Sequence, residues 1–132
     1  MRLRTQKDKT KLSYKYHESH AVDGTEEIEF EVSDKEKAEQ LLNKLGFVAY
    51  RHQEKKRHTL LLNGVTFDID TWPRIPTYVE LEGESEEDLK KAAAAVGLDW
   101  NNAVLKNPRA VIEENYKIPV GTMTYFTFDR FE

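Results

Sequence analysis

The sequence predicts an α+β protein in which an antiparallel sheet of about seven strands curls into a partial or complete barrel with two or three flanking helices. Three observations predict this fold. Most segments are short and alternate between polar and apolar residues, as half-buried strands do. Asn63-Gly64 separates two such segments and is a strong signal for an antiparallel hairpin. Other segments combine an apolar period of 3.6 residues with capping residues, which indicates helices that cover the apolar side of the sheet.

The N-terminal part of the chain is expected to form three strands and one helix. The strands are predicted over residues 2–6, 11–17 and 26–32. The first two can pair across the polar turn KDKT, and the third alternates most clearly, with glutamates on one face and apolar residues on the other. Ser33 is the predicted N-cap of the helix, with Glu36 three residues later as its capping-box partner. Gly46 is expected to end this helix.

The rest of the chain is expected to alternate between strands and helices. Further strands are predicted over residues 47–53, 55–62, 65–70, 78–82 and 122–131. Ser85 is the predicted N-cap of a second helix, with Asp88 as its partner, and Gly97 ends it. A third helix is expected to begin at Asn107-Pro108, because proline is favoured at the first helical position.

The strand faces opposite the apolar ones are charged in nearly every predicted strand. The charged residues are Arg2, Arg4, Lys11, Lys15, Glu27, Glu29, Glu31, Lys55, Arg57, Asp68, Asp70, Glu80 and Glu82. One interpretation is a flat sheet with a solvated face, on which acids and bases form cross-strand ion pairs of roughly 0.2–1 kcal/mol each. The other is a curled sheet that encloses the charges in a tunnel. Basic side chains suit a polyanion, and clustered carboxylates suit Mg²⁺ or Mn²⁺, so such a tunnel fits a metal-bound phosphate chain. Periodicity alone does not decide between the two.

Length and composition restrict the class of protein. A chain of 132 residues is expected to form one domain. Its net charge of −4 provides no electrostatic footprint for duplex nucleic acid, so no nucleic-acid partner is expected. The absence of cysteine excludes disulfides and thiolate metal sites. No leader or long apolar run is visible, which predicts a cytoplasmic protein without a membrane partner.

Several motifs occur in one order along the chain: RLR at residues 2–4, LSYK at 12–15, EEIEFEVSD at 26–34, LLNKLGF at 41–47, KKRHTLLLNGVTFDID at 55–70 and YVELEG at 78–83. This ordered set resembles the CYTH, or triphosphate tunnel metalloenzyme, superfamily. The resemblance covers about residues 1–97. Its most specific part runs from DID through WPRIPTYVELEG, and is closest to the bacterial branch that resembles class IV adenylate cyclases.

The resemblance implies a barrel with a charged tunnel that binds a metal-complexed triphosphate. It implies phosphate-binding roles for Arg2, Arg4, Lys15 and Arg57. It implies catalytic roles for Asp68, Glu80 and Glu82, and metal ligation by Asp68, Asp70, Glu80, Glu82, Glu27 and Glu29, with Mg²⁺ or Mn²⁺ as the ion. In a cyclase, ATP would yield cyclic AMP and pyrophosphate. The alternatives are a triphosphatase acting on tripolyphosphate or thiamine triphosphate, and a phosphate-binding protein without turnover.

One part of the family pattern is not present in this chain. The family has an ExExK strand before the strand that corresponds to RLR, and here RLR follows the first residue directly. We therefore expect a single CYTH-like domain over residues 1–132 that is truncated at its N-terminus. Whether such a chain closes its barrel and turns over substrate is open at this point. The missing strand would leave an open sheet edge, at which a second copy could pair to form a homodimer.

Overall fold

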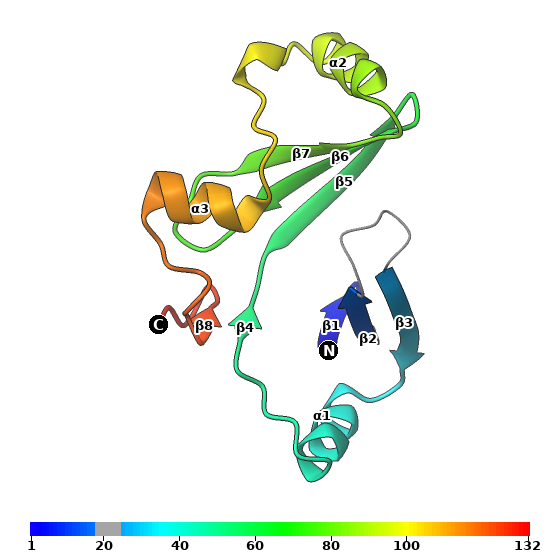
Figure 1. Ribbon diagram of the computed structural model, residues 1–132, viewed down its shortest axis with the longest axis vertical. Helices are drawn as coiled ribbons and strands as arrows, with labels where there is room; N and C mark the ends of the chain where they lie inside the picture. The colour runs from blue at the N-terminus through cyan, green and yellow to red at the C-terminus, as the bar shows by residue number, and fades with distance from the viewer. Residues whose placement is uncertain (18–24) are drawn as a thin grey trace. The chain divides into compact units, whose positions relative to one another are not determined.

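The computed structural model describes residues 1–17 and 25–132, which form two compact units, Met1–Ala49 and Tyr50–Glu132 (Figure 1). Each unit is described separately. Across the described residues the structure confirms an α+β fold with antiparallel sheets and three α-helices. No described helix is both long enough and apolar enough to cross a membrane.

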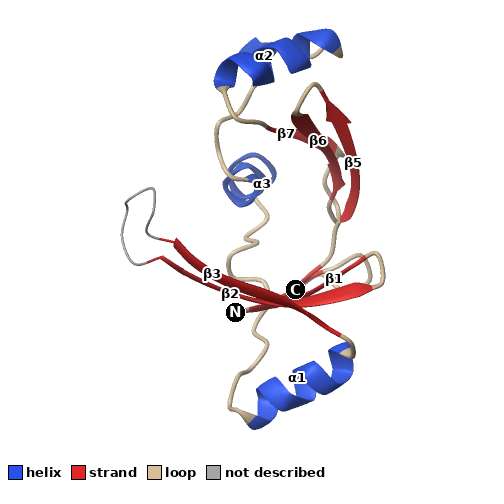
Figure 2. Ribbon diagram, turned by 90° about the vertical axis from the view of Figure 1, so that its right-hand side faces the viewer, coloured by secondary structure: helices blue, strands red, loops and turns tan. Residues whose placement is uncertain are grey.

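The first unit contains an antiparallel sheet of three strands followed by one helix. The strands are β1 (Arg2–Gln6), β2 (Lys9–His17) and β3 (Thr25–Val32), which lie side by side in Figure 2. The β1–β2 turn is made by Lys7 and Asp8, which both have positive φ angles. Leu12 lies opposite Leu3 on one side and Phe30 on the other, so the apolar residues share one face. The charged residues therefore share the opposite face, as the alternation predicts.

Helix α1 (Lys35–Lys44) begins one residue later than predicted. Its N-cap is Asp34, whose carboxylate accepts a hydrogen bond of 3.0 Å from the backbone N–H of Lys37, so the prediction of Ser33 was wrong. The helix ends before Gly46, which has a φ of +91° and supplies the left-handed conformation that often follows a helix. None of the residues of α1 is fully buried within the described structure, and Leu41 and Leu45 are exposed.

The second unit is built on an antiparallel sheet of β5 (Lys56–Leu62), β6 (Val65–Thr71) and β7 (Tyr78–Glu82). Asn63 and Gly64 join β5 to β6 with φ angles of 50° and 79°, as a two-residue hairpin turn with two positive φ angles requires. The predicted hairpin is therefore confirmed. Phe67 lies opposite Leu60 and Leu81, which makes one face apolar, while Asp68 lies opposite Glu80 on the other face.

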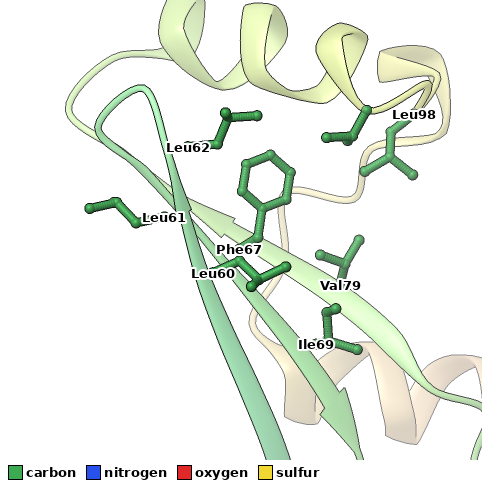
Figure 3. Close-up of a pocket in the computed structure, with 8 residues that line it drawn as sticks. Leu60, Leu61, Leu62, Phe67, Ile69, Val79 and Leu98 are labelled. Carbon is green, nitrogen blue, oxygen red and sulfur yellow. The ribbon is translucent and has the colours of Figure 1, made fainter.

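Helix α2 (Glu86–Ala95) covers part of this apolar face. It begins at the predicted N-cap, since the Ser85 hydroxyl accepts a hydrogen bond of 3.1 Å from the backbone N–H of Asp88. Ala92 packs with Val65 and Phe67 in a buried cluster. Beside this cluster lies an apolar concavity of about 450 Å³, lined by leucines of β5 and by Phe67, Ile69, Val79, Val96 and Leu98 (Figure 3).

The C-terminal part of the second unit has its own core. A short 3₁₀ helix (Trp100–Asn102) leads to α3 (Pro108–Tyr116), which begins at the predicted N-cap Asn107 with a proline in its first turn. The core contains Ile75, Ile112, Val120, Met123 and Phe126, and Phe126 has no exposed surface. Trp72 stacks on Phe126 with their ring centroids 5.4 Å apart. This core therefore fixes the turn between β6 and β7.

Two predicted strands were wrong in extent. Of residues 47–53, only β4 (His52–Gln53) is a strand, and it pairs in parallel with β8 (Tyr125–Phe126). Residues 122–131 do not form one strand, because the backbone N–H of Thr127 donates to the carbonyl of Arg130 and the chain turns back, so that Phe131 bridges to Phe126. Among the described residues the strands form three sheets, β1-β2-β3, β4-β8 and β5-β6-β7, and none closes on itself. Closure of a barrel stays a prediction.

Candidate functional site

The charged face of the β5–β6–β7 sheet carries a cluster of ion pairs centred on Arg57. The register places Arg57 opposite Asp70 and places Asp68 opposite Glu80. Nε and Nη2 of Arg57 each donate to one oxygen of Asp70 at 2.6 Å. Nη2 also donates to Oε2 of Glu80 at 2.6 Å, and Nη1 lies 2.6 Å from Oδ2 of Asp68. One guanidinium thus joins three carboxylates from two strands.

Asp70 is the buried centre of this cluster, and its side chain has no exposed surface. Nζ of Lys55 lies 2.7 Å from Oδ2 of Asp70 and 5.2 Å from the centroid of the Trp72 ring. Burial by itself raises the pKa of Asp70, but the hydrogen bonds from Arg57 and Lys55 outweigh it and hold the pKa below its usual value. Asp70 is therefore an ionised residue that both cations stabilise.

The pKa values of Glu80 and Tyr78, which lie beside Asp70 on β7, are shifted mainly by burial. Burial raises the pKa of Glu80, and the nearby charge of Asp70 adds to the rise, although Arg57 and Lys55 oppose it. Burial raises the pKa of Tyr78 to about 12, and its hydroxyl accepts a hydrogen bond of 2.9 Å from the Trp72 indole. Two cations thus face three carboxylates, so the Arg57 cluster has a net negative charge.

The charged face of the first unit is dominated by exposed ion pairs between β2 and β3. The pairs are Lys9–Glu31 at 3.2 Å, Lys11–Glu29 at 2.6 Å and Lys15–Glu27 at 3.1 Å. The hydrogen bond from Lys11 lowers the pKa of Glu29. These are the cross-strand ion pairs of the solvated-face interpretation, and at this exposure each contributes little to stability.

A small polar pocket lies on the same face of the first unit. It has a volume of about 130 Å³ and is lined by Met1, Arg2, Ser13 and Lys15. Arg2 lies opposite Ser13, and Arg4 lies opposite Lys11, because β1 and β2 pair in antiparallel register. Five basic residues of β1 and β2 share this face with three glutamates of β3, so the face has a net positive charge.

The structure groups the predicted site residues into two sets. Arg2 and Lys15 share the pocket of the first unit, with Arg4 on the same face. Arg57, Asp68, Asp70 and Glu80 form the cluster of the second unit. Glu27 and Glu29 pair with lysines, and Glu82 is an exposed residue at the end of β7. Their roles in binding or catalysis stay predictions.

Sequence reasoning missed three residues of these sites. The sequence placed Lys55 on a charged strand face but gave it no role in the site, whereas only 20% of its side chain is exposed and it pairs with Asp70. Thr59 donates a hydrogen bond of 2.5 Å to Oδ1 of Asp68, and Ser13 lines the polar pocket. Each alternates with a predicted site residue on its strand, so the period of two was the signal that could have identified them.

The carboxylates of the Arg57 cluster have the right chemistry for a hard divalent cation, which prefers oxygen ligands. In residues 1–17 and 25–132, however, no group of three or more aspartate, glutamate or histidine side chains is arranged to hold a metal ion. The reason is visible in the geometry, because the guanidinium of Arg57 lies between Asp68, Asp70 and Glu80. While Arg57 holds all three carboxylates, they do not fit a resident metal.

Comparison with known proteins gives one family and several similar solved structures, including two from Pyrococcus species. A family model described as the CYTH domain matches residues 1–109. The structure of the PH1012 protein from Pyrococcus horikoshii OT3 is similar at 25% identity and a TM-score of 0.54. A conserved hypothetical protein from Pyrococcus furiosus is similar at 28% identity and a TM-score of 0.52. Each match covers 76% of this chain but only 65% of the other chain. No curated protein matches the chain.

Proposed function

Because this chain belongs to the CYTH-domain family, we propose that it binds a metal-complexed triphosphate through the charged faces of its strands. The observation that carries this proposal is the polar pocket between Arg2, Ser13 and Lys15, on a face with a net positive charge. The family resemblance assigns phosphate binding to Arg2 and Lys15, and the pocket places both beside a hydroxyl donor. A phosphate chain is the class of ligand that such a set of donors recognises.

The donors of the pocket differ in what they can contribute. Arg2 offers a planar fork that can contact two phosphate oxygens at once, whereas Lys15 offers a mobile point charge. Lys15 pairs with Glu27 at 3.1 Å, but both side chains are about half exposed, at 54% and 43%. Since such exposed pairs contribute about 0–1 kcal/mol, an incoming phosphate can displace Glu27 at little cost. Arg4 adds a further positive charge on the same face.

We propose that the divalent cation, Mg²⁺ or Mn²⁺, reaches the protein as part of the phosphate complex. In the second unit, Asp68, Glu80 and Glu82 are the proposed catalytic acids and, with Asp70, proposed oxygen ligands. In the first unit, Glu27 and Glu29 are further proposed oxygen ligands. A bound divalent cation would neutralise charge on the phosphate oxygens during their transfer. The net negative charge of the Arg57 cluster supports a cation partner at Asp68 and Glu80.

The proposed reaction is that of a class IV adenylate cyclase. The 3′-hydroxyl of the ribose would lose its proton to solvent, and its oxygen would attack the α-phosphorus of ATP. The bond from that phosphorus to the bridging oxygen would break, and pyrophosphate would leave with the electron pair. A triphosphatase is the alternative, in which water attacks the terminal phosphorus of tripolyphosphate or thiamine triphosphate. Binding without turnover is the third possibility, supported by the acids of β3, which are occupied by lysines.

A homodimer is also part of the proposal. In the described residues β1 and β3 each have only one strand neighbour, so each presents an edge at which another copy could pair. Light scattering measures the mass directly. A monomer at ordinary concentrations would contradict the dimer without affecting phosphate binding.

Calorimetry with tripolyphosphate and with ATP, each with and without Mg²⁺ or Mn²⁺, tests the proposal. We expect binding that weakens at least about tenfold in Arg2→Ala and in Lys15→Ala, since a hydrogen bond to a charged group contributes about 1.5–3 kcal/mol. Lys44→Ala is the matched control, because Lys44 lies in the last turn of α1 and not on a strand of the charged face. Absence of binding at millimolar ligand would refute the proposal.

Product analysis then separates the three possibilities. Cyclic AMP and pyrophosphate from ATP identify a cyclase, and orthophosphate from any of the three triphosphates identifies a triphosphatase. Binding without either product identifies a binding protein.

A further inference from the structure

We infer that the first unit pairs with a second copy of the chain through its apolar sheet face, on which helix α1 of the partner lies. Two surfaces of this unit are complementary. The first, called the apolar patch, is formed on β2 and β3 by Tyr14, Tyr16, Ile28 and Phe30. The second, called the leucine ridge, is formed at the C-terminal end of α1 by Leu41 and Leu45. Such a dimer rests on the homodimer of the proposed function, but a sheet face rather than a strand edge is the surface that becomes covered.

The apolar patch lies on the side of the β1–β2–β3 sheet that is opposite the ion pairs. Tyr14 lies opposite Ile28, and Leu12 lies opposite Phe30, so the strand register brings these side chains to one face. The rings of Tyr14 and Tyr16 stack with their centroids 6.5 Å apart. The four residues of the patch nevertheless remain between 39% and 54% exposed. A contiguous apolar patch on a folded unit marks an interaction site.

The leucine ridge belongs to the same unit but is not covered by it. Helix α1 lies on one side of the sheet and contacts β1 (Figure 2), and its Leu42 is half-buried. Leu41 and Leu45 are one helical turn apart on one side of the helix, and they are 61% and 65% exposed. An amphipathic helix normally packs such a stripe against an apolar surface. The unit therefore carries both an uncovered sheet face and an uncovered helical ridge.

A two-fold axis satisfies both surfaces at once, because the leucine ridge of each copy can lie on the apolar patch of the other. The patch and the ridge together expose roughly 600 Å² per copy, so the pair buries on the order of 1,200 Å². This area reaches the lower end of the range for specific, stable interfaces. A second copy thus supplies the apolar contact that each surface needs.

The charges beside the two surfaces are complementary as well. Glu26 lies opposite Tyr16 in the strand register and is exposed at the end of the apolar patch. Lys44 is exposed beside the leucine ridge, three residues after Leu41 and directly before Leu45. Within residues 1–17 and 25–132, neither Glu26 nor Lys44 forms an ion pair. The dimer pairs Lys44 of each copy with Glu26 of the other, once at each end of the two-fold interface.

The experiment exchanges these two charges and measures the dimer dissociation constant of the full chain by sedimentation equilibrium. Glu26→Lys and Lys44→Glu each create two like-charge contacts in a homodimer, so each variant alone should dimerise at least about tenfold more weakly than wild type. An equimolar mixture of the two variants regains an attractive contact at both positions and should return to within about threefold of wild type. Asn43→Glu is the matched control, because Asn43 lies on the side of α1 opposite the leucine ridge and should leave the dissociation constant unchanged.

Phe30→Lys tests the apolar contact itself. It places a charge in the apolar patch and should weaken the dimer at least about a hundredfold. If Phe30→Lys does not fold by circular dichroism, the charge variants still decide, because Glu26 and Lys44 are exposed. A monomeric wild-type protein would overturn the inference, as would a mixture that dimerises no more tightly than the single variants. Wild-type affinity in every variant would indicate pairing through the strand edges and would overturn it too.

Phosphate binding is tested separately from the dimer. The polar pocket lies on the other face of the sheet, so a folded, monomeric Phe30→Lys protein should bind tripolyphosphate as wild type does. Loss of tripolyphosphate binding by the wild-type protein would refute the proposed function and leave the dimer result standing.

Discussion

The different environments of Asp70 and Glu80 predict opposite results for two substitutions on one sheet face. Asp70→Asn removes the charge that holds Arg57 and Lys55, and leaves both cations without their buried partner. Breaking a buried ion pair costs about 3–5 kcal/mol. The side chains of Arg57 and Lys55 are 24% and 20% exposed, so water can partly solvate them after the change. The lower end, about 3 kcal/mol, is therefore the expected loss of unfolding free energy.

The assay is thermal unfolding at pH 7, followed by near-ultraviolet circular dichroism. For a unit of this size each kcal/mol shifts Tm by about 4–8 °C, so Asp70→Asn should melt roughly 12–24 °C lower. Glu80→Gln is the matched control. The raised pKa of Glu80 means that folding disfavours its charged form, so a neutral isostere should leave the unfolding free energy within about 1 kcal/mol of wild type or raise it. An unchanged Tm in Asp70→Asn, or an equal loss in both variants, would refute this reasoning.

Three further predictions concern pH, core packing and the hairpin turn. The pKa of Asp70 is lower in the folded protein than its usual value of 3.8. The stabilisation that the Asp70 charge provides is therefore complete above about pH 4–5 and is lost as the pH falls through the lower, folded pKa. The difference in denaturation midpoint between wild type and Asp70→Asn should stay level from pH 7 to about pH 5 and shrink only in strong acid. Phe126→Ala should lower the unfolding free energy by about 3–5 kcal/mol in guanidinium denaturation, because the ring is fully buried against Trp72. A much smaller loss would mean that the C-terminal core is not formed. Gly64→Ala should cost about 1–2 kcal/mol, because φ is +79° in the hairpin turn, and a neutral effect in the same assay would contradict that conformation.

The fold was predictable where the sequence specifies local backbone geometry. Asn63-Gly64 fixed one hairpin, and the capping residues Ser85 and Asn107 fixed the start of two helices. The tail was not predictable in this way. Its alternating residues suggested a strand, but the hydrogen bond between Thr127 and Arg130 makes a turn, which depends on contacts formed after the chain has folded back.

The sequence predicted which site residues share a face of the sheet, but not which of them are in contact. The period of two places Arg57, Asp68, Asp70 and Glu80 on one side of a sheet before any coordinates are known. It does not say that Arg57 reaches all three acids, because that depends on the register of β6 with both neighbours. It also does not say that Asp70 is buried, since burial follows from packing beyond the sheet.

The stacking of Phe126 on Trp72 limits where the chain can be truncated without loss of its C-terminal core. The CYTH match ends at residue 109, inside the first turn of α3. A protein expressed only as far as that residue would keep every family motif that this chain contains. It would lose Ile112, Val120, Met123 and Phe126, which form most of the core beneath the β6–β7 turn. Trp72 would then face water, and with it the aromatic surface beneath Lys55. A boundary drawn from sequence similarity alone would therefore remove part of what supports the charged cluster.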